Sequence, residues 1–350
     1  MVNWILAACD IRRLLGTTGS AMKRVAVYFG GALLLAMVFL AFRSFTPPIF
    51  SDNSISRLER VSINDYQQYL LVRGHDRDLP VLLFLHGGPG MPAMYLAHDF
   101  QRELEKHFVV VHWDQRGAGK SYRKDTDPGT LTISQLLSDT DAVVEYLIDE
   151  LGTHRIWLVG HSHGSYLGAL YAQRYPEKLM AFVGLGQVAD PQRATLVQDD
   201  FLRDQLQDLG LPPDTRISEA HRENLLFLTG SELHGETSFM PLVLTGLLAN
   251  EYNLRDVLNV KKGSSFSSRN MVYDLERNLI ASATEFDVPV AIVMGVHDMT
   301  TPVSLAREYY EAITAPDKRF ILVKEASHFP HFEQPGQFLS LMLDLKAAWN

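Results

Sequence analysis

Six short apolar runs, separated by stretches of helical pattern, constrain the fold of this 350-residue chain more than any other feature. The runs are rich in β-branched residues and almost continuously hydrophobic, as in strands that are buried on both faces of a parallel sheet. They lie at 81–85, 108–113, 155–159, 180–185, 290–294 and 320–323, and helical patterns lie at about 131–151, 163–175, 302–313 and 335–348. Alternation of this kind predicts a doubly wound α/β domain with a mostly parallel sheet.

The alternation is interrupted after the fourth run and resumes at Val290. The intervening stretch is helix-like, with Gly and Pro breaks, and leucines at 242, 244, 247 and 248 suggest one apolar helix face. We therefore interpret residues 188–286 as a helical cap inserted into the sheet domain. The cap separates a first part of the core, 58–187, from a second part, 287–350.

A membrane segment is predicted near the N-terminus. Residues 25–42 contain no charge, and their length is at the lower limit for a hydrocarbon core about 30 Å thick. More basic residues precede this segment than follow it, so residues 1–24 are expected to form a cytoplasmic n-region and the folded part to be extracytoplasmic. We expect a single-pass anchor followed by a linker over 43–57. The alternative is a cleaved signal peptide and a secreted protein.

Composition excludes several classes of protein. The hydrophobic fraction is 46% and the charged fraction 21%, which is ordinary for a globular protein and not for a disordered chain or a polytopic membrane protein. The single cysteine, Cys9, excludes an intramolecular disulfide framework and a Cys-rich zinc site. A formal net charge of −9 argues against broad electrostatic binding to nucleic acid.

The sequence Gly-His-Ser-His-Gly at 160–164 follows one apolar run directly and opens a helical pattern. It fits the G-x-S-x-G nucleophile elbow in its strand–turn–helix setting, with Ser162 as the nucleophile. Glycines two residues before and two after allow the flanking backbones to pass closely. The alternative is a tight turn in which a serine caps the helix.

A serine nucleophile needs a base and a group that orients the base. In this topology the acid and then the histidine follow the serine. Asp298 and His328 each come just after an apolar run, so both are expected at the sheet edge where Ser162 emerges. Asp190 is the rival acid and His331 is the rival base.

The oxyanion of an acyl-transfer reaction needs backbone N–H donors that are already in place. One is expected from His163, at the start of the helix after the nucleophile. The other is expected from the His-Gly-Gly-Pro-Gly segment at 86–90, with Gly88 as the first choice and Gly87 as the second.

Two patterns resemble other kinds of site. Gly119-Lys120-Ser121 is like the end of a phosphate-binding loop, but the first glycine of that motif would have to stand at Asp114. We therefore expect Asp114 and Arg116 to brace the loops around the site. His161 and His163 have no carboxylate or cysteine at ligand spacing, so no metal site is predicted.

Three motifs resemble one known family. HGGPG at 86–90, DQRGAGKS at 114–121 and GHSHGS at 160–165 look like the prolyl aminopeptidase (proline iminopeptidase) branch of the α/β-hydrolase superfamily. The resemblance covers about 58–187 and 287–350. It implies an α/β-hydrolase fold with a helical cap inserted after the sixth strand. It also implies a serine hydrolase that removes an N-terminal residue, proline above all, from short peptides.

The chain departs from this family at two points. The family usually has Trp after the nucleophile, where this chain has His163, and its members are commonly soluble and cytoplasmic. Some enzymes of the branch bind the free amino terminus through glutamates of the cap. Glu232, Glu236 and Glu251 lie in the cap here, and Glu232 and Glu236 are the candidates, together with Gly87, for substrate binding. The alternative for each glutamate is a solvated surface charge.

Three hypotheses follow for function. The first is a serine hydrolase that needs no cofactor and forms an acyl-enzyme, with prolyl aminopeptidase activity on short peptides. The second keeps the mechanism but takes small acyl esters, as a carboxylesterase or lipase does. The third is a catalytically silent α/β-hydrolase module that only binds a ligand. The expected partners are a small peptide or ester and, through the N-terminal helix, a membrane.

Overall fold

The computed structural model describes residues 24–32, 34, 35, 37–212, 214–273 and 277–349. The chain divides into two compact units, Met1–Arg43 and Ser44–Asn350. The expected n-region falls almost wholly outside the described residues, as does Cys9. The helix Arg24–Phe42 is long and apolar enough to cross a membrane. A signal sequence near an N-terminus would have the same length and composition.

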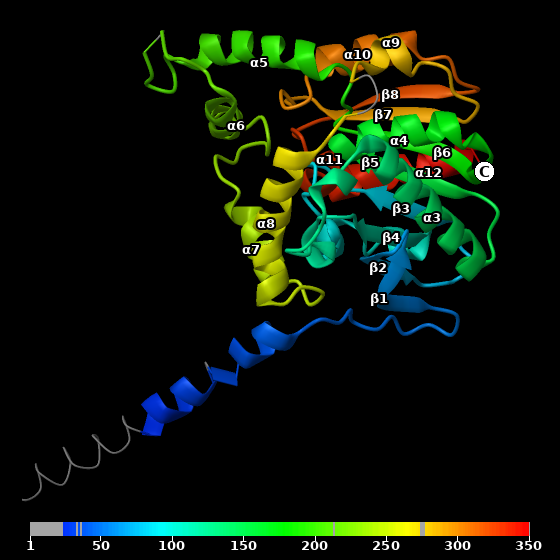
Figure 1. Ribbon diagram of the computed structural model, residues 1–350, viewed down its shortest axis with the longest axis vertical. Coiled ribbons are helices and arrows are strands. Elements are labelled where there is room, and N and C mark those ends of the chain that lie inside the picture. Colours follow the sequence, from blue (N-terminus) through cyan, green and yellow to red (C-terminus); the bar gives the residue numbers. More distant parts are fainter. Residues whose placement is uncertain (1–23, 33, 36, 213, 274–276, 350) are drawn as a thin grey trace, which may run out of the picture. The chain divides into compact units, whose positions relative to one another are not determined.

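An eight-stranded sheet forms the centre of the second unit, and the strands follow the order β1-β2-β4-β3-β5-β6-β7-β8 (Figure 1). The strands β3 to β8 run parallel, whereas β2 is antiparallel to both β1 and β4. Their bounds are Ile55–Ile63 (β1), Tyr66–Gly74 (β2), Val81–Leu85 (β3), Val109–Asp114 (β4), Ile156–His161 (β5), Leu179–Leu185 (β6), Val290–Gly295 (β7) and Lys318–Val323 (β8).

The six apolar runs found in the sequence form β3 to β8, as predicted. The hairpin of β1 and β2 was not anticipated, and β1 begins at Ile55, inside the segment expected to be a linker. Asn64 and Asp65 make the connection with φ of 46° and 60°, the conformation that a two-residue type I′ turn needs. Most of β1 is only partly buried and mixes polar with apolar residues, so it lacks the continuous hydrophobicity that marks the inner strands.

Helices cover both faces of the sheet. In β3, Leu83 and Leu85 pack in the cluster that includes residues of α3 and α4, whereas Leu82 and Phe84 pack in the cluster that includes Phe338 of α12. The larger helices of the core are α3 (Ile133–Leu151), α4 (His163–Arg174), α10 (Val303–Ala312) and α12 (Pro335–Trp349), close to the predicted ranges. Short α-helices at Ala97–Phe100 (α2) and Pro330–Glu333 (α11) and five 3-10 helices complete this part.

Among the residues described between β6 and β7, where the sequence predicted a helical insertion, five helices form. They are α5 (Pro191–Gln205), α6 (Glu219–Leu228), α7 (Met240–Leu248), α8 (Leu254–Asn270) and α9 (Leu279–Ser282). In Figure 1 the helices α5 to α8 (green to yellow) lie beside the sheet. The fold is therefore a doubly wound α/β core with a helical insertion after the sixth strand.

Candidate active site

The turn that carries Ser162 joins β5 to α4 and has an unusual backbone. Ser162 has φ 54° and ψ −122°, a region that residues other than glycine rarely adopt. A Cβ atom on Gly160 would overlap with the carbonyl oxygen of Gly164, and one on Gly164 would overlap with the carbonyl oxygen of Leu85. The two glycines are therefore required by close backbone packing, as the G-x-S-x-G pattern predicted.

We expect Gly164→Ala to lower the free energy of unfolding by about 1–3 kcal/mol or more, because the added methyl group must displace backbone atoms. Urea unfolding followed by circular dichroism measures the effect. Gly336→Ala is the matched control, since no atom lies within 4 Å of the position its Cβ would take and the residue belongs to α12. Equal stability of the two variants would contradict the steric account of the elbow.

The sheet brings the predicted acid and base together. Asp298 follows β7 and His328 follows β8, and Nδ1 of His328 donates to Oδ2 of Asp298 at 3.0 Å. Asp298 is fully buried and His328 is 3% exposed. Ser162 and His328 line the same cavity, which has a volume of about 770 Å³. All three residues lie at the carboxyl ends of parallel strands, where open α/β sheets place their sites.

The charge of Asp298 governs the protonation of His328. Burial by itself lowers the pKa of His328, but the carboxylate of Asp298, with smaller contributions from Glu232 and Glu333, raises that pKa to about 9. A hydrogen bond at Nδ1 leaves the other ring nitrogen, Nε2, for proton transfer. This arrangement suits a histidine that must stabilise positive charge during a reaction.

Several residues to which the sequence analysis did not give this role hold the pair in place. The Thr301 backbone N–H and hydroxyl donate to the two oxygens of Asp298, each at 2.8 Å. His161 Nε2 donates to the carbonyl of His328 at 2.8 Å. The carboxylate of Glu333 accepts from the backbone N–H groups of the residues on either side of His328. The contacts of Thr301 and Glu333 are local, at three to six residues along the chain, whereas the contact of His161 joins segments 167 residues apart that only folding brings together.

The rival acid and base have other roles. Asp190 caps α5, since its Oδ1 accepts from the backbone N–H groups of the second and third residues of that helix. His331 packs against Phe100, with 4.8 Å between the ring centroids. Burial lowers the pKa of His331 to about 3, and the charge of His328 adds to this effect. The geometry therefore favours Asp298 and His328 over these two residues.

The expected oxyanion donors lie around Ser162. Gly87 and Gly88 line the cavity together with Ser162, and a Cβ on Gly87 would come within 2.9 Å of the Ser162 Cβ. His163 is the first residue of α4, so its backbone N–H is among those that have no partner within the helix. The His163 side chain is buried and stacks on Tyr166, with 6.4 Å between ring centroids.

The three cap glutamates lie in different surroundings. Glu232 lines the cavity, and its Oε1 accepts from the Thr300 hydroxyl at 2.9 Å. Burial raises the pKa of Glu232, and its backbone carbonyl also accepts from the His328 N–H at 3.1 Å. Glu236 is exposed and is not part of the cavity lining. Glu251 is fully buried and accepts from His98 Nε2 at 2.7 Å. Of the two proposed glutamates, only Glu232 reaches the cavity.

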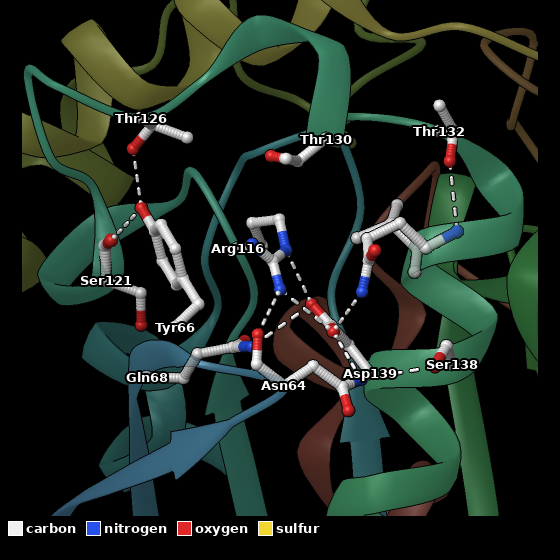
Figure 2. Close-up of polar contacts among 12 residues, drawn as sticks. Asn64, Tyr66, Gln68, Arg116, Ser121, Thr126, Thr130, Thr132, Ser138 and Asp139 are labelled. Carbon is white, nitrogen blue, oxygen red and sulfur yellow. Dashed lines mark hydrogen bonds and ion pairs between the residues drawn. The ribbon is translucent and has the colours of Figure 1, made fainter.

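The DQRGAGKS segment supports the loops around the site, as expected for Arg116. The guanidinium of Arg116 makes two hydrogen bonds to the buried carboxylate of Asp139 in α3, at 2.8 and 3.1 Å (Figure 2). Three amide side chains also donate to this carboxylate, those of Asn64, Gln68 and Gln135. Arg116 therefore joins the loop after β4 to the β1–β2 hairpin and to α3.

The same segment also joins the core to the cap. Asp114 accepts from the Tyr252 hydroxyl and from the Lys120 backbone N–H, and burial raises the pKa of Asp114 to about 7. The ammonium group of Lys120 lies 2.6 Å from the Asp256 carboxylate, in α8. Since this ammonium is already paired and buried, it does not serve a phosphate as the lysine of a phosphate-binding loop does.

No three His, Cys, Asp or Glu side chains are grouped so as to hold a metal ion in the part of the chain that the structure describes. His161 and His163 point to different partners, since the first contacts His328 and the second contacts Tyr166 and Tyr273.

Comparison with known proteins identifies the family. Residues 80–335 match the family model of the alpha/beta hydrolase fold. The chain belongs to this family. The match includes Ser162, Asp298 and His328, which the strand ends bring to one edge of the sheet.

Individual α/β hydrolases resemble this chain over most of its length. "Probable aminopeptidase YbaC" of Bacillus subtilis (strain 168) is 31% identical over 304 residues, which is 83% of this chain and 96% of that protein. The crystal structure of a proline iminopeptidase-related protein from Thermus thermophilus covers 84% of this chain and 98% of its own, at 20% identity and a TM-score of 0.61. That of a membrane phospholipase A, described as a bacterial virulence factor, covers 99% of both chains, at 17% identity and a TM-score of 0.55.

Proposed function

We propose that this α/β hydrolase is a serine hydrolase that works through an acyl-enzyme. The observation that carries the proposal is the buried hydrogen bond from His328 to Asp298 beside a cavity that Ser162 also lines. In the proposed reaction the Ser162 hydroxyl attacks the substrate carbonyl carbon while His328 Nε2 accepts its proton. Asp298 holds the orientation of His328 and stabilises its protonated form.

The remaining steps follow from the same groups. The N–H groups of Gly88 and His163 are proposed to bind the oxyanion, and the protonated His328 gives its proton to the leaving group. A water molecule, activated by His328, then attacks the acyl-enzyme and releases Ser162. No step calls for a cofactor.

For the substrate, we propose a short peptide from which the enzyme releases N-terminal proline or a similar residue. Glu232 supports this choice, because its carboxylate lies at the cavity and near His328, where it is placed to pair with a protonated amino terminus. The names of the relatives from B. subtilis and T. thermophilus agree with a peptidase. Gly87 contributes to the wall of the cavity beside the Ser162 backbone turn.

The second candidate function is hydrolysis of acyl esters. It is favoured by the apolar side chains that line much of the cavity, among them Phe227, Phe239 and Leu242.

We also propose that Arg24–Phe42 anchors the enzyme in a membrane in a single pass, with the hydrolase on the extracytoplasmic side; a cleaved leader remains the alternative. One protein of similar fold is named a membrane phospholipase A, and that name describes an enzyme that acts on lipid esters.

Turnover of a proline anilide compared with a short acyl ester separates the two candidates, and Glu232→Gln sharpens the comparison. Loss of the carboxylate charge should lower kcat/KM for the proline anilide by about 10-fold or more, since hydrogen bonds to charged groups contribute about 1.5–3 kcal/mol. The KM for the acyl ester should not change. Glu236→Gln is the matched control, because Glu236 is exposed and away from the cavity.

Glu232→Gln should also change how activity depends on pH. Catalysis needs neutral His328, so the activity of the natural enzyme should rise with pH towards about 9. Removing the negative charge of Glu232 destabilises protonated His328 and lowers its pKa, which moves the acidic limb of the kcat/KM profile to lower pH. No proline-anilide turnover by either protein, together with rapid ester turnover, would sink the peptidase proposal and support the esterase.

A further inference from the structure

Two helices of the cap present an unusual surface. The helices α7 and α8 lie side by side (Figure 1), and α7 contains no charged residue. Leu242 and Gly246 of α7 are buried, whereas other apolar residues of the helix are exposed. The exposed apolar side chains of the two helices are Met240, Val243, Leu244, Leu248, Leu254 and Leu258, which we call the α7–α8 face.

This face is too large to be a scatter of single exposed residues. Leu248 is 76% exposed and Leu258 is 61% exposed. Within each helix these positions are mainly three or four residues apart, so they lie on one side of that helix. Exposed apolar surfaces of this kind mark contacts with a partner or a lipid phase. A partner for the α7–α8 face is therefore expected.

The position of the face along the chain indicates which partner this is. The backbone N–H of Phe45 donates to the carbonyl of Asn250, two residues beyond the end of α7, at 3.2 Å. The apolar helix ends at Phe42, and three residues of extended chain span at most about 11 Å. If that helix crosses a bilayer, Phe45 is tethered within this distance of the end of the helix, and Asn250 lies one hydrogen bond further on. Phe45 itself is 45% exposed and adds an aromatic side chain beside the face.

The charges around the face fit a lipid surface as well. The exposed residues of α8 include Arg255, Lys261 and Lys262, and the one acid of the helix, Asp256, is largely buried and paired with Lys120. This basic surface stands out in a chain whose formal net charge is −9. Apolar residues beside Lys and Arg characterise helices that lie in the interface of a bilayer with anionic headgroups.

We propose that the α7–α8 face docks on the surface of the lipid bilayer that holds the N-terminal helix. The apolar side chains would enter the headgroup region, and the basic residues of α8 would contact lipid phosphates. Leu242 and Phe239, in the same segment, line the cavity with Ser162. Docking would therefore put the cavity about one helix diameter, roughly 10–12 Å, from the bilayer surface. The inference goes beyond the proposed hydrolysis and depends only on the proposed anchor.

A fluorescence quenching experiment on the full chain tests the inference. Cys9 is the only cysteine, so Cys9→Ser provides a background in which Leu244→Cys carries a single environment-sensitive fluorophore. Leu196→Cys is the matched control, because Leu196 is 65% exposed and lies in α5, at the other end of the cap (Figure 1). Leu248→Cys serves as the second position if the first variant does not fold. The proteins are placed in nanodiscs of phosphatidylcholine and phosphatidylglycerol.

We expect a nitroxide-labelled phospholipid to quench the label at 244 several-fold more strongly than the label at 196, and aqueous iodide to show the opposite order. Equal quenching at both positions overturns the proposal. Protection of position 244 from both quenchers, with cross-linking of two chains through it, also overturns it and assigns the face to a second copy. Failure of the protein to stay in the nanodiscs overturns the anchor and the docking together. Fluorophosphonate labelling of the same samples reports the hydrolase separately.

Discussion

Replacing Ser162 by alanine is expected to abolish covalent labelling by a fluorophosphonate probe and to lower kcat by roughly 10⁴- to 10⁶-fold. The elbow leaves Ser162 as the residue between β5 and α4 at the wall of the cavity, with the bonded pair of His328 and Asp298 beside it. Loss of the hydroxyl removes the nucleophile, whereas the cavity and the donors for the oxyanion remain. In-gel fluorescence of the labelled protein and steady-state turnover of the better substrate measure the two effects.

The two histidines provide a matched control for this prediction. His328→Gln should lose labelling and turnover to a similar degree, because no base then activates Ser162. His331→Gln should keep its labelling, since His331 is held among aromatic rings and the bond to Asp298 belongs to His328. Labelling that persists in Ser162→Ala would place the nucleophile elsewhere. A natural protein that resists the probe altogether would favour the silent binding module.

The second large effect is expected on stability. Arg116→Ala should lower the free energy of unfolding by about 3–5 kcal/mol, because removing one partner of a buried pair leaves the other charge uncompensated. Asp139 is fully buried and Arg116 is 6% exposed, and the pair is bonded through both carboxylate oxygens (Figure 2). The amide groups of Asn64, Gln68 and Gln135 would still donate to Asp139, but none of them carries a balancing charge. Urea unfolding measures the loss.

Arg123→Ala is the control for this substitution. Arg123 also pairs with an aspartate, Asp125, at 2.8 Å, but both side chains of that pair are more than half exposed. Water and salt screen such a pair, so its loss should leave the unfolding curve unchanged. If the two arginine variants unfold at the same urea concentration, the buried pair is not the brace that its geometry implies.

Local patterns predicted the inner strands and the elbow well. Continuous hydrophobicity reports burial on both faces of a strand, and the runs that form β3 to β8 have it. The β1–β2 hairpin was missed because β1 mixes polar and apolar residues at the sheet edge, and its only strong signal is the Asn64-Asp65 turn. Such a turn is common to many loops, so it does not by itself predict a strand on each side.

The cap glutamates show where local patterns end. Nothing in the sequence around Glu232, Glu236 or Glu251 separates them. Folding brings the first beside His328, leaves the second in solvent and buries the third against His98. These outcomes depend on how segments distant in sequence pack, and a motif of a few residues does not contain that information.

The amino-acid sequence alone was enough for the doubly wound core, the order of Ser162, Asp298 and His328, and the apolar N-terminal segment. These features rest on local periodicity, on glycines at close backbone contacts, and on the rule that parallel strands end at one edge. The hydrogen bond to Asp298 that separates His328 from His331, the place of Glu232 at the cavity and the exposure of the α7–α8 face came from the folded arrangement. Each of these features depends on how helices and loops that are distant in sequence pack together, which sets the distances between side chains and their burial.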